Sequence, residues 1–237
     1  MKKFIGKRIL KTLIIIFVLV TVIFTLLHFS PADPIAIILG KPVIYLYPEK
    51  EIEVFVDVAV DNGEIFVTYP EKNDGWRVTA TPDGKIIDEN GITHNYLFWE
   101  AKANIEFDLS EGFVVEGKNS VEFLQEKLSY LGLNQNEINE FIVYWLPYMI
   151  DNPYNLVSFQ WENYDKFAPL KIEPNPDSIQ RVYMALKPLD EYVEIPEQQL
   201  EKFERTGFTV IEWGGSAIYT RWIESGFGSI FKGANLS

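Results

Sequence analysis

Cysteine is absent from this chain of 237 residues, and histidine occurs only at His28 and His94. Without thiols the protein has no disulfide, no lipoprotein cysteine and no thiol nucleophile. A histidine-based zinc site needs more nitrogen or sulfur ligands than the chain has. A Ser-His-Asp triad would have to use His94, and no G-x-S-x-G motif accompanies that residue. We therefore expect no metal site, no cofactor and no catalytic residue that the sequence can name.

Long apolar runs are also scarce, and the main exception is Thr12–Phe29, which has eighteen residues and no formal charge. A helix over this run would reach about 27 Å, close to the hydrocarbon thickness of a bilayer. The cations that precede it are Lys2, Lys3, Lys7, Arg8 and Lys11. By the positive-inside rule the N-terminus stays in the cytoplasm and the remaining chain is extracytoplasmic. The sequence thus predicts a single-pass protein of the cell membrane; a cleaved signal peptide is the alternative.

Two motifs in this region carry a resemblance: KRIL (Lys7–Leu10) and IFTLLHFSPADP (Ile23–Pro34). Residues 1–40 are similar to the first membrane helix of dipeptide and oligopeptide ABC transporter permeases. Such a permease needs further apolar spans, and the rest of the sequence has no second charge-free run of membrane length. The resemblance therefore implies a shared anchor, a fusion, or an accessory or remnant of a peptide transporter permease, and it does not imply transport.

Positive charge is sparse beyond residue 40. The chain has 21 basic and 34 acidic residues. Five of the basic residues and one of the acidic residues lie in residues 1–40, so the remaining 16 basic and 33 acidic residues give a net charge of −17. Such a surface repels nucleic acid, so we expect no nucleic-acid partner. The expected partners are the lipid bilayer, through Thr12–Phe29, and an envelope protein or a glycan.

Residues 41–103 have the period-two pattern of β-strands. Alternating apolar residues run from Ile52 to Val60, the turn Asp61-Asn62-Gly63 follows, and Glu64–Tyr69 would be the returning strand of a hairpin. Further strands separated by Gly-containing turns are expected at Val43–Tyr47, Trp76–Thr81, Lys85–Asp88 and Thr93–Ala103. These segments predict an antiparallel meander or a sandwich-like sheet.

Beyond Gly117 the period becomes helical. One helix would carry Val121, Leu124, Leu128 and Leu131 on one face and end at Gly132. A second would begin with a capping box of Asn134 and Glu137 and stop at Pro147. A third helix is expected over Pro196–Arg205. Strands are expected at Asn155–Trp161 and Gln180–Lys187, before this helix, and at Phe208–Trp213, after it.

The predicted fold is α+β. A single N-terminal transmembrane helix (1–40 with its flanks) would precede an extracytoplasmic domain (41–215) of antiparallel sheet with two or three short helices packed on it. Residues 216–237 are expected to form a loosely ordered tail, because Gly and Ser accumulate there.

Six segments of the outer domain carry a second resemblance. Residues 41–215 are similar to a family of uncharacterised prokaryotic domains with no established activity, through KPVIYLYP (Lys41–Pro48), NDGWRVTATPDG (Asn73–Gly84), YLFWE (Tyr96–Glu100), FIVYWLPYM (Phe141–Met149), NPYNLVSFQ (Asn152–Gln160) and FTVIEWGG (Phe208–Gly215).

Glutamate stands beside tryptophan at Trp99-Glu100, Trp161-Glu162 and Glu212-Trp213. Two carboxylates near aromatic platforms are what a glycosidase or a sugar-binding cleft needs. Strand alternation offers a plainer explanation, in which each Trp points inward and each Glu outward. The candidate ligand-binding residues are Trp99, Glu100, Glu212 and Trp213. We expect a binding or scaffolding module; the enzymatic alternative is a hydrolase acting on glycan through Glu100 and Glu212.

Overall fold

A computed structural model describes residues 37–103 and 105–218 of the chain. The predicted membrane segment Thr12–Phe29 and residues 219–237 of the predicted tail lie outside the described residues. Within the described ranges, no helix is both long and apolar enough to cross a bilayer.

The larger of two sheets has seven strands in the order β3-β7-β1-β12-β11-β9-β8. Neighbouring strands are antiparallel except β11 and β12, which run parallel. Their bounds are β1 Ile37–Tyr47, β3 Gly63–Tyr69, β7 Leu97–Ala103, β8 Phe113–Glu116, β9 Tyr154–Phe159, β11 Ser178–Leu189 and β12 Thr209–Ala217. The smaller sheet is antiparallel throughout, in the order β10-β2-β4-β5-β6, with β2 Ile52–Val58, β4 Trp76–Ala80, β5 Ile86–Ile87, β6 Thr93–His94 and β10 Leu170–Glu173.

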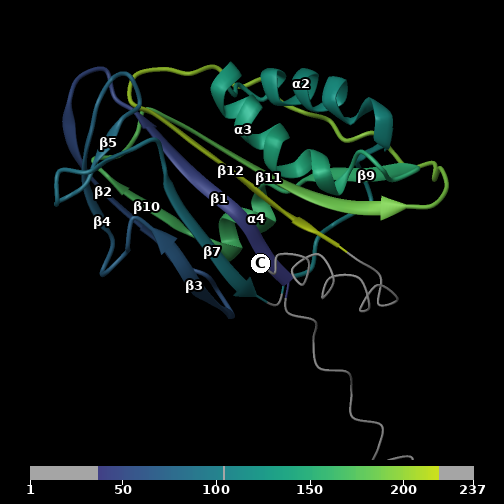
Figure 1. Cartoon of the computed structure of the whole chain (residues 1–237), viewed down its shortest axis with the longest axis horizontal. Helices are drawn as coiled ribbons and strands as arrows, with labels where there is room; N and C mark the ends of the chain where they lie inside the picture. Colours follow the sequence, from purple (N-terminus) through teal and green to yellow (C-terminus); the bar gives the residue numbers. More distant parts are fainter. Residues whose placement is uncertain (1–36, 104, 219–237) are drawn as a thin grey trace, which may run out of the picture. The chain divides into compact units, whose positions relative to one another are not determined.

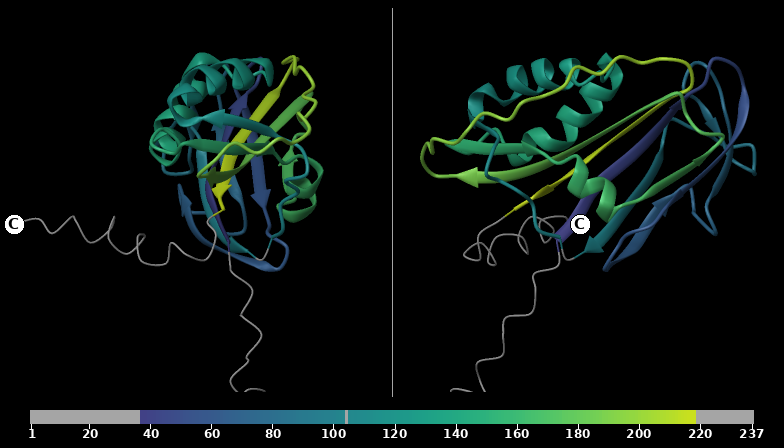
Figure 2. Two further views of the ribbon diagram at one scale, coloured as in Figure 1. Left: turned by 90° about the vertical axis from the view of Figure 1, so that its right-hand side faces the viewer. Right: turned by 180° about the vertical axis from the view of Figure 1, so that it is seen from behind.

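The described residues pack in three layers around two apolar cores (Figures 1 and 2). Alternate residues of β2 point inward, and Val54, Val56 and Val58 meet Leu97 and Trp99 of the large sheet. On the other face, α2 (Ser120–Tyr130) and α3 (Gln135–Trp145) cover the large sheet and bury residues such as Phe141 against it. The fold is therefore α+β with mainly antiparallel sheets.

Local sequence explains the two long helices. Asn134 caps α3 by accepting from the N–H groups of Asn136 and Glu137, and Glu137 reaches back to the Asn134 N–H, which completes the predicted capping box. Gly132, with φ +86°, follows α2 and lets the chain turn toward α3. Shorter helical pieces are α4 (Glu162–Phe167) and the 3-10 turns η1 (Gly117–Asn119) and η2 (Leu146–Tyr148).

The predicted hairpin of Ile52–Val60 and Glu64–Tyr69 is wrong. The turn between them exists, and Asn62 has φ +49° there, but β2 pairs with β4 and β10 while β3 pairs with β7 in the other sheet. The turn therefore moves the chain between sheets. Inward valines commit β2 to the inter-sheet core, whereas β3 is a largely exposed edge strand.

The helix predicted over Pro196–Arg205 is also wrong. Residues 190–207, which we call the strap, form no helix and cross the edge of the large sheet beside β8 and β9. Gln198 exchanges two hydrogen bonds with the backbone of Phe159, and Arg205 donates to the Gly132 carbonyl and to Glu137. Tertiary hydrogen bonds thus replace the helical ones, although Leu200 and Phe203 do pack inward.

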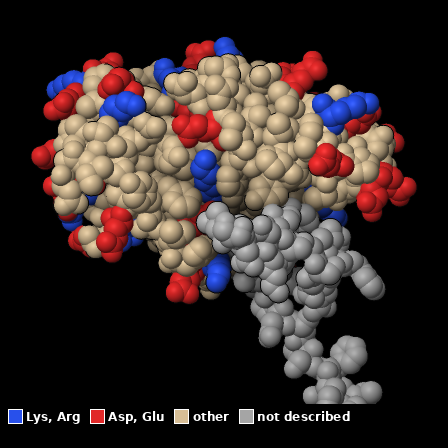
Figure 3. Space-filling model, viewed as in Figure 1, with Lys and Arg blue, Asp and Glu red and all other residues tan. Residues whose placement is uncertain are grey.

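Strand β12 runs to Ala217 and so extends past its predicted end at Trp213. Figure 3 shows acidic side chains spread over one face of the molecule, with fewer basic ones between them. This spread is what the excess of Asp and Glu in the sequence leads us to expect.

Candidate functional site

Lys41 lies at an irregularity of β1. The pairing of β1 shifts register between Gly40 and Val43 on the β12 side and between Leu39 and Val43 on the β7 side. Lys41 itself has φ +48°, a left-handed conformation that few residues other than glycine adopt. Backbone outliers of this kind cluster at functional sites, so the bulge marks Lys41 as a candidate.

The Lys41 ammonium lies among three aromatic rings. Its Nζ is 5.9 Å from the ring centroid of Tyr96, 5.2 Å from that of Tyr144 and 5.1 Å from that of Trp213. Rings at these distances attract a cation through their negative faces. Among the described residues, no carboxylate forms an ion pair with this ammonium, and the side chain is partly exposed. The positive charge is thus held by rings and remains open to a further partner.

Two carboxylates lie beside the rings. Glu100 accepts a hydrogen bond from the Lys41 backbone N–H at 3.1 Å, and Glu140 accepts one from the Tyr45 hydroxyl at 3.0 Å. Burial lowers the pKa of the Lys41 amine, and the negative charge of Glu140 opposes that shift. Burial raises the pKa of Glu100, while the Lys41 N–H lowers it. Neighbouring half-buried groups with shifted pKa values are typical of functional sites.

We call these residues the Lys41 cluster: Lys41, Tyr45, Tyr96, Glu100, Glu140, Tyr144 and Trp213. Tyr45 packs edge-on against Tyr96 at 5.4 Å between ring centroids. Burial raises the pKa of the Tyr45 and Tyr144 hydroxyls, and the charge of Glu140 raises that of Tyr45 further. The phenols therefore keep their protons. Trp213 and Tyr45 are buried, so the cluster offers a ligand the Lys41 ammonium, the Glu140 carboxylate and the partly exposed rings of Tyr96 and Tyr144.

Trp99 and Glu212 meet on the opposite face of the large sheet. The Glu212 carboxylate is fully buried and accepts hydrogen bonds from the Trp99 indole at 3.0 Å and the Tyr164 hydroxyl at 3.2 Å. The Arg181 guanidinium binds its second oxygen at 2.5 Å and also reaches Asp165 at 2.8 Å. Both carboxylate oxygens of Glu212 thus accept from protein donors inside the inter-sheet core, which is the arrangement of a structural ion pair.

Strand alternation separates the two predicted glutamates. Trp99 and Glu212 face the inter-sheet core, whereas Glu100 and Trp213 face the helices. Glu100 and Glu212 therefore do not share a cleft. The simple expectation that Glu212 points outward is wrong, because β12 is central and buried on both faces.

Sequence reasoning missed Lys41, Tyr45, Tyr96, Glu140 and Tyr144. One available signal was the position of Lys41, which is the single charge between Ile35 and Tyr47 in an otherwise apolar run. Glu140 and Tyr144 lie one helical turn apart on α3, and only the packing of α3 on the sheet brings them to Lys41. In residues 37–103 and 105–218, no group of three or more potential ligand side chains could hold a metal ion.

Comparison with known proteins gives one partial similarity to report. The chain is 49% identical over 63 residues to a protein of Butyrivibrio fibrisolvens named "Uncharacterized protein in bglA 3'region". The matched stretch covers 25% of this chain and 64% of that protein, so the chain spans just under two thirds of the relative's length. No family model matches the chain, and no solved structure matches it.

Proposed function

We propose that this chain is a membrane-anchored, extracytoplasmic binding module, and that the Lys41 cluster binds a glycan of the cell envelope. The observation that carries the proposal is the Lys41 ammonium, which is partly exposed among three aromatic rings and forms no ion pair with a carboxylate of the described residues. Aromatic faces can stack on sugar rings, and convergent polar groups fix a ligand's orientation. In this proposal the ammonium donates to sugar oxygens and Glu140 accepts from sugar hydroxyls.

The location in this proposal is supported by the sequence alone. The apolar run Thr12–Phe29 and the five cations before it favour an anchor with the domain outside. An accessory role beside a peptide transporter is the other proposal that the N-terminal resemblance motivates. Co-purification of permease and ATPase subunits in mild detergent would support that role, and their absence would count against it.

Glycan binding is tested with the purified full chain in mild detergent, first on an array of envelope glycans and then by titration. Binding is followed by tryptophan fluorescence, to which Trp213 beside Lys41 contributes. We expect Lys41→Ala to weaken binding about 10- to 100-fold, because a hydrogen bond from a charged group contributes about 1.5–3 kcal/mol.

The matched control is Lys50→Ala, which removes an exposed lysine just after β1. This variant should bind the array glycan as the parent does. If the Lys41→Ala protein and the parent bind the glycan equally well, the proposal that the Lys41 cluster is the glycan site is wrong.

A further inference from the structure

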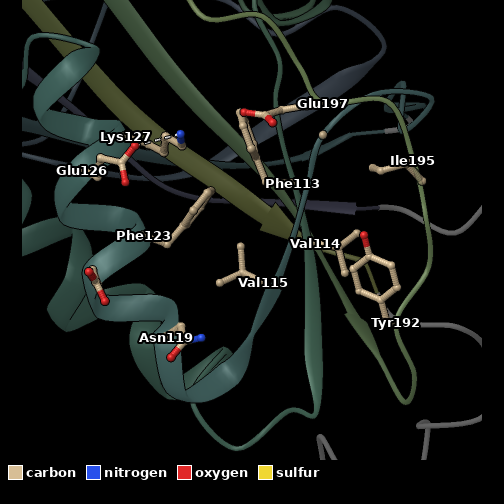
Figure 4. A pocket seen from close by; sticks show the side chains of 12 residues that line it. Phe113, Val114, Val115, Asn119, Phe123, Glu126, Lys127, Tyr192, Ile195 and Glu197 are labelled. Carbon is tan, nitrogen blue, oxygen red and sulfur yellow. Dashed lines mark hydrogen bonds and ion pairs between the residues drawn. The ribbon is translucent and has the colours of Figure 1, made fainter.

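A groove runs along the outer edge of the large sheet, away from the Lys41 cluster. Strand β8 forms its floor, α2 forms one wall and the strap forms the other, as Figure 4 shows. Its volume is about 450 Å³, and its apolar lining includes Phe113, Val115, Phe123, Tyr192 and Ile195. The groove continues toward Tyr130 and Leu200 in a second hollow of about 710 Å³. The two hollows share Phe113, Glu126, Lys127 and Glu197.

Strand β8 is the last strand of the sheet on this side and pairs only with β9. Main-chain groups of an edge strand alternate between the partner strand and the outside. Gly117 donates to Pro153 on the β9 side. Gly112 instead faces outward, since it donates to the Pro196 carbonyl at 3.0 Å and accepts from the Gln198 N–H at 3.4 Å. The backbone N–H and C=O of Val114, two residues further along, therefore also point away from β9.

The strap pairs with the outer side of this edge at one position only, among the described residues. Glu197 forms a parallel bridge with Gly112, and the bridge extends no further along β8. Beyond it, no backbone group among the described residues pairs with Val114 on the outer side. An exposed strand edge beside an apolar groove is the usual receptor for an added strand.

Charge at the rim indicates what kind of strand would fit. Glu122 and Glu126 stand on the α2 wall, and Glu197 stands on the strap. Lys127, the one cation among the residues that line the first hollow, is already paired with Glu126 at 3.0 Å and lies over the Phe113 ring. The rim is thus net negative over an apolar floor, which is complementary to a segment with alternating basic and apolar residues.

We propose that this groove docks an extended basic segment of a partner protein, which adds to β8 as a strand beside Val114. Apolar side chains of the segment would lie on Phe113 and Phe123, and its cations would meet Glu122 and Glu197. This inference is independent of glycan binding at the Lys41 cluster, because the two sites share no residue.

The probe is a fluorescent seven-residue peptide of alternating Val and Lys, titrated by anisotropy against the full chain in mild detergent. We expect saturable binding that weakens with salt, and at least tenfold weaker binding of the Val-Glu counterpart. The same Val-Lys peptide with N-methyl groups at alternate residues cannot donate on one edge. We expect it also to bind at least tenfold more weakly if a strand is added.

On the protein side, Val114→Pro removes the outward N–H and should lower affinity at least tenfold, and Glu122→Lys should do the same without altering the backbone. Equal binding of the N-methylated and parent peptides would overturn strand addition, and this comparison uses the unmodified protein. Dimerisation of the chain that Val114→Pro abolishes would show that a second copy is the occupant, and would likewise overturn the proposal.

Discussion

Lys41 and Glu212 show how the environment of single residues separates a candidate site from a structural pair. Both belong to the central strands of the same sheet. Glu212 is fully buried and is surrounded by donors from Trp99, Tyr164 and Arg181. Lys41 is partly exposed, and its ammonium lies among three rings without an ion pair to a carboxylate of the described residues. A satisfied buried charge holds the fold together, whereas an open charge can bind a ligand.

Glu212→Gln should therefore destabilise the protein strongly. The change leaves Arg181 buried without its main counter-charge, which typically costs about 3–5 kcal/mol of unfolding free energy. Asp165→Asn removes the other, 61% exposed partner of Arg181 and should cost less than about 1 kcal/mol. Chemical denaturation followed by circular dichroism compares the two variants. Similar losses of unfolding free energy in the two variants would show that the buried ion pair of Glu212 contributes no more to stability than the exposed one.

The pH dependence of glycan binding should follow the Lys41 amine. Because burial lowers its pKa, the ammonium of the folded protein loses its proton at a lower pH than an ordinary lysine, whose pKa is 10.5. Binding through the ammonium then falls as pH rises, and the fall begins at a lower pH than an ordinary lysine would give. Fluorescence titrations between neutral pH and pH 10 check this expectation. Affinity that stays constant over that range would contradict it.

At the scale of elements, α3 and the strands beneath it create the Lys41 cluster. Gly40 and Gly215 face each other on β1 and β12, and the absence of side chains there lets the Trp145 ring of α3 approach the sheet. That close approach brings Glu140 and Tyr144 to Lys41. Small residues at a helix–sheet contact thus help to position the site.

Gly215→Ala should disturb this contact. A Cβ at residue 215 would lie 2.5 Å from the Met184 carbonyl oxygen and 2.6 Å from Trp145. We expect a loss of about 1–3 kcal/mol in unfolding free energy, as is usual for overpacking. At Gly40 the nearest atoms would be 3.3 Å away, so Gly40→Ala should cost less. A thermal or chemical denaturation series that gives equal costs would argue against the tight helix–sheet approach.

Elements with strong local signals could be predicted from the sequence. The capping box of Asn134 and Glu137 fixed the start of α3, and alternation identified β2. Partners at long range could not be predicted in this way. Nothing local says that β2 and β3 join different sheets, or that Arg205 binds Glu137 instead of continuing a helix.

The same limit applies to the candidate site. Adjacent Trp and Glu residues drew attention to Trp99, Glu100, Glu212 and Trp213, and the structure divides them between two faces of one sheet. The alternation rule places neighbours on opposite faces, but it cannot say that both faces are buried. That outcome depends on a second sheet and on two helices that lie far away in sequence.

At the scale of the whole molecule, the glycan proposal places its ligand outside the membrane. The domain is acidic, and it presents the Lys41 cluster and the β8 groove on different parts of its surface. Its anchor and orientation are proposed from Thr12–Phe29 and the basic flank. An envelope glycan is available only if the domain lies on that side.

Protease treatment of intact cells tests this placement most directly, with permeabilised cells and a cytoplasmic marker protein as controls. Where an outer membrane or a dense wall is present, spheroplasts take the place of intact cells. We predict that added protease degrades the domain at exposed sites while the marker survives, and that the basic N-terminus stays protected. Protection of the domain until the membrane is permeabilised would contradict the account.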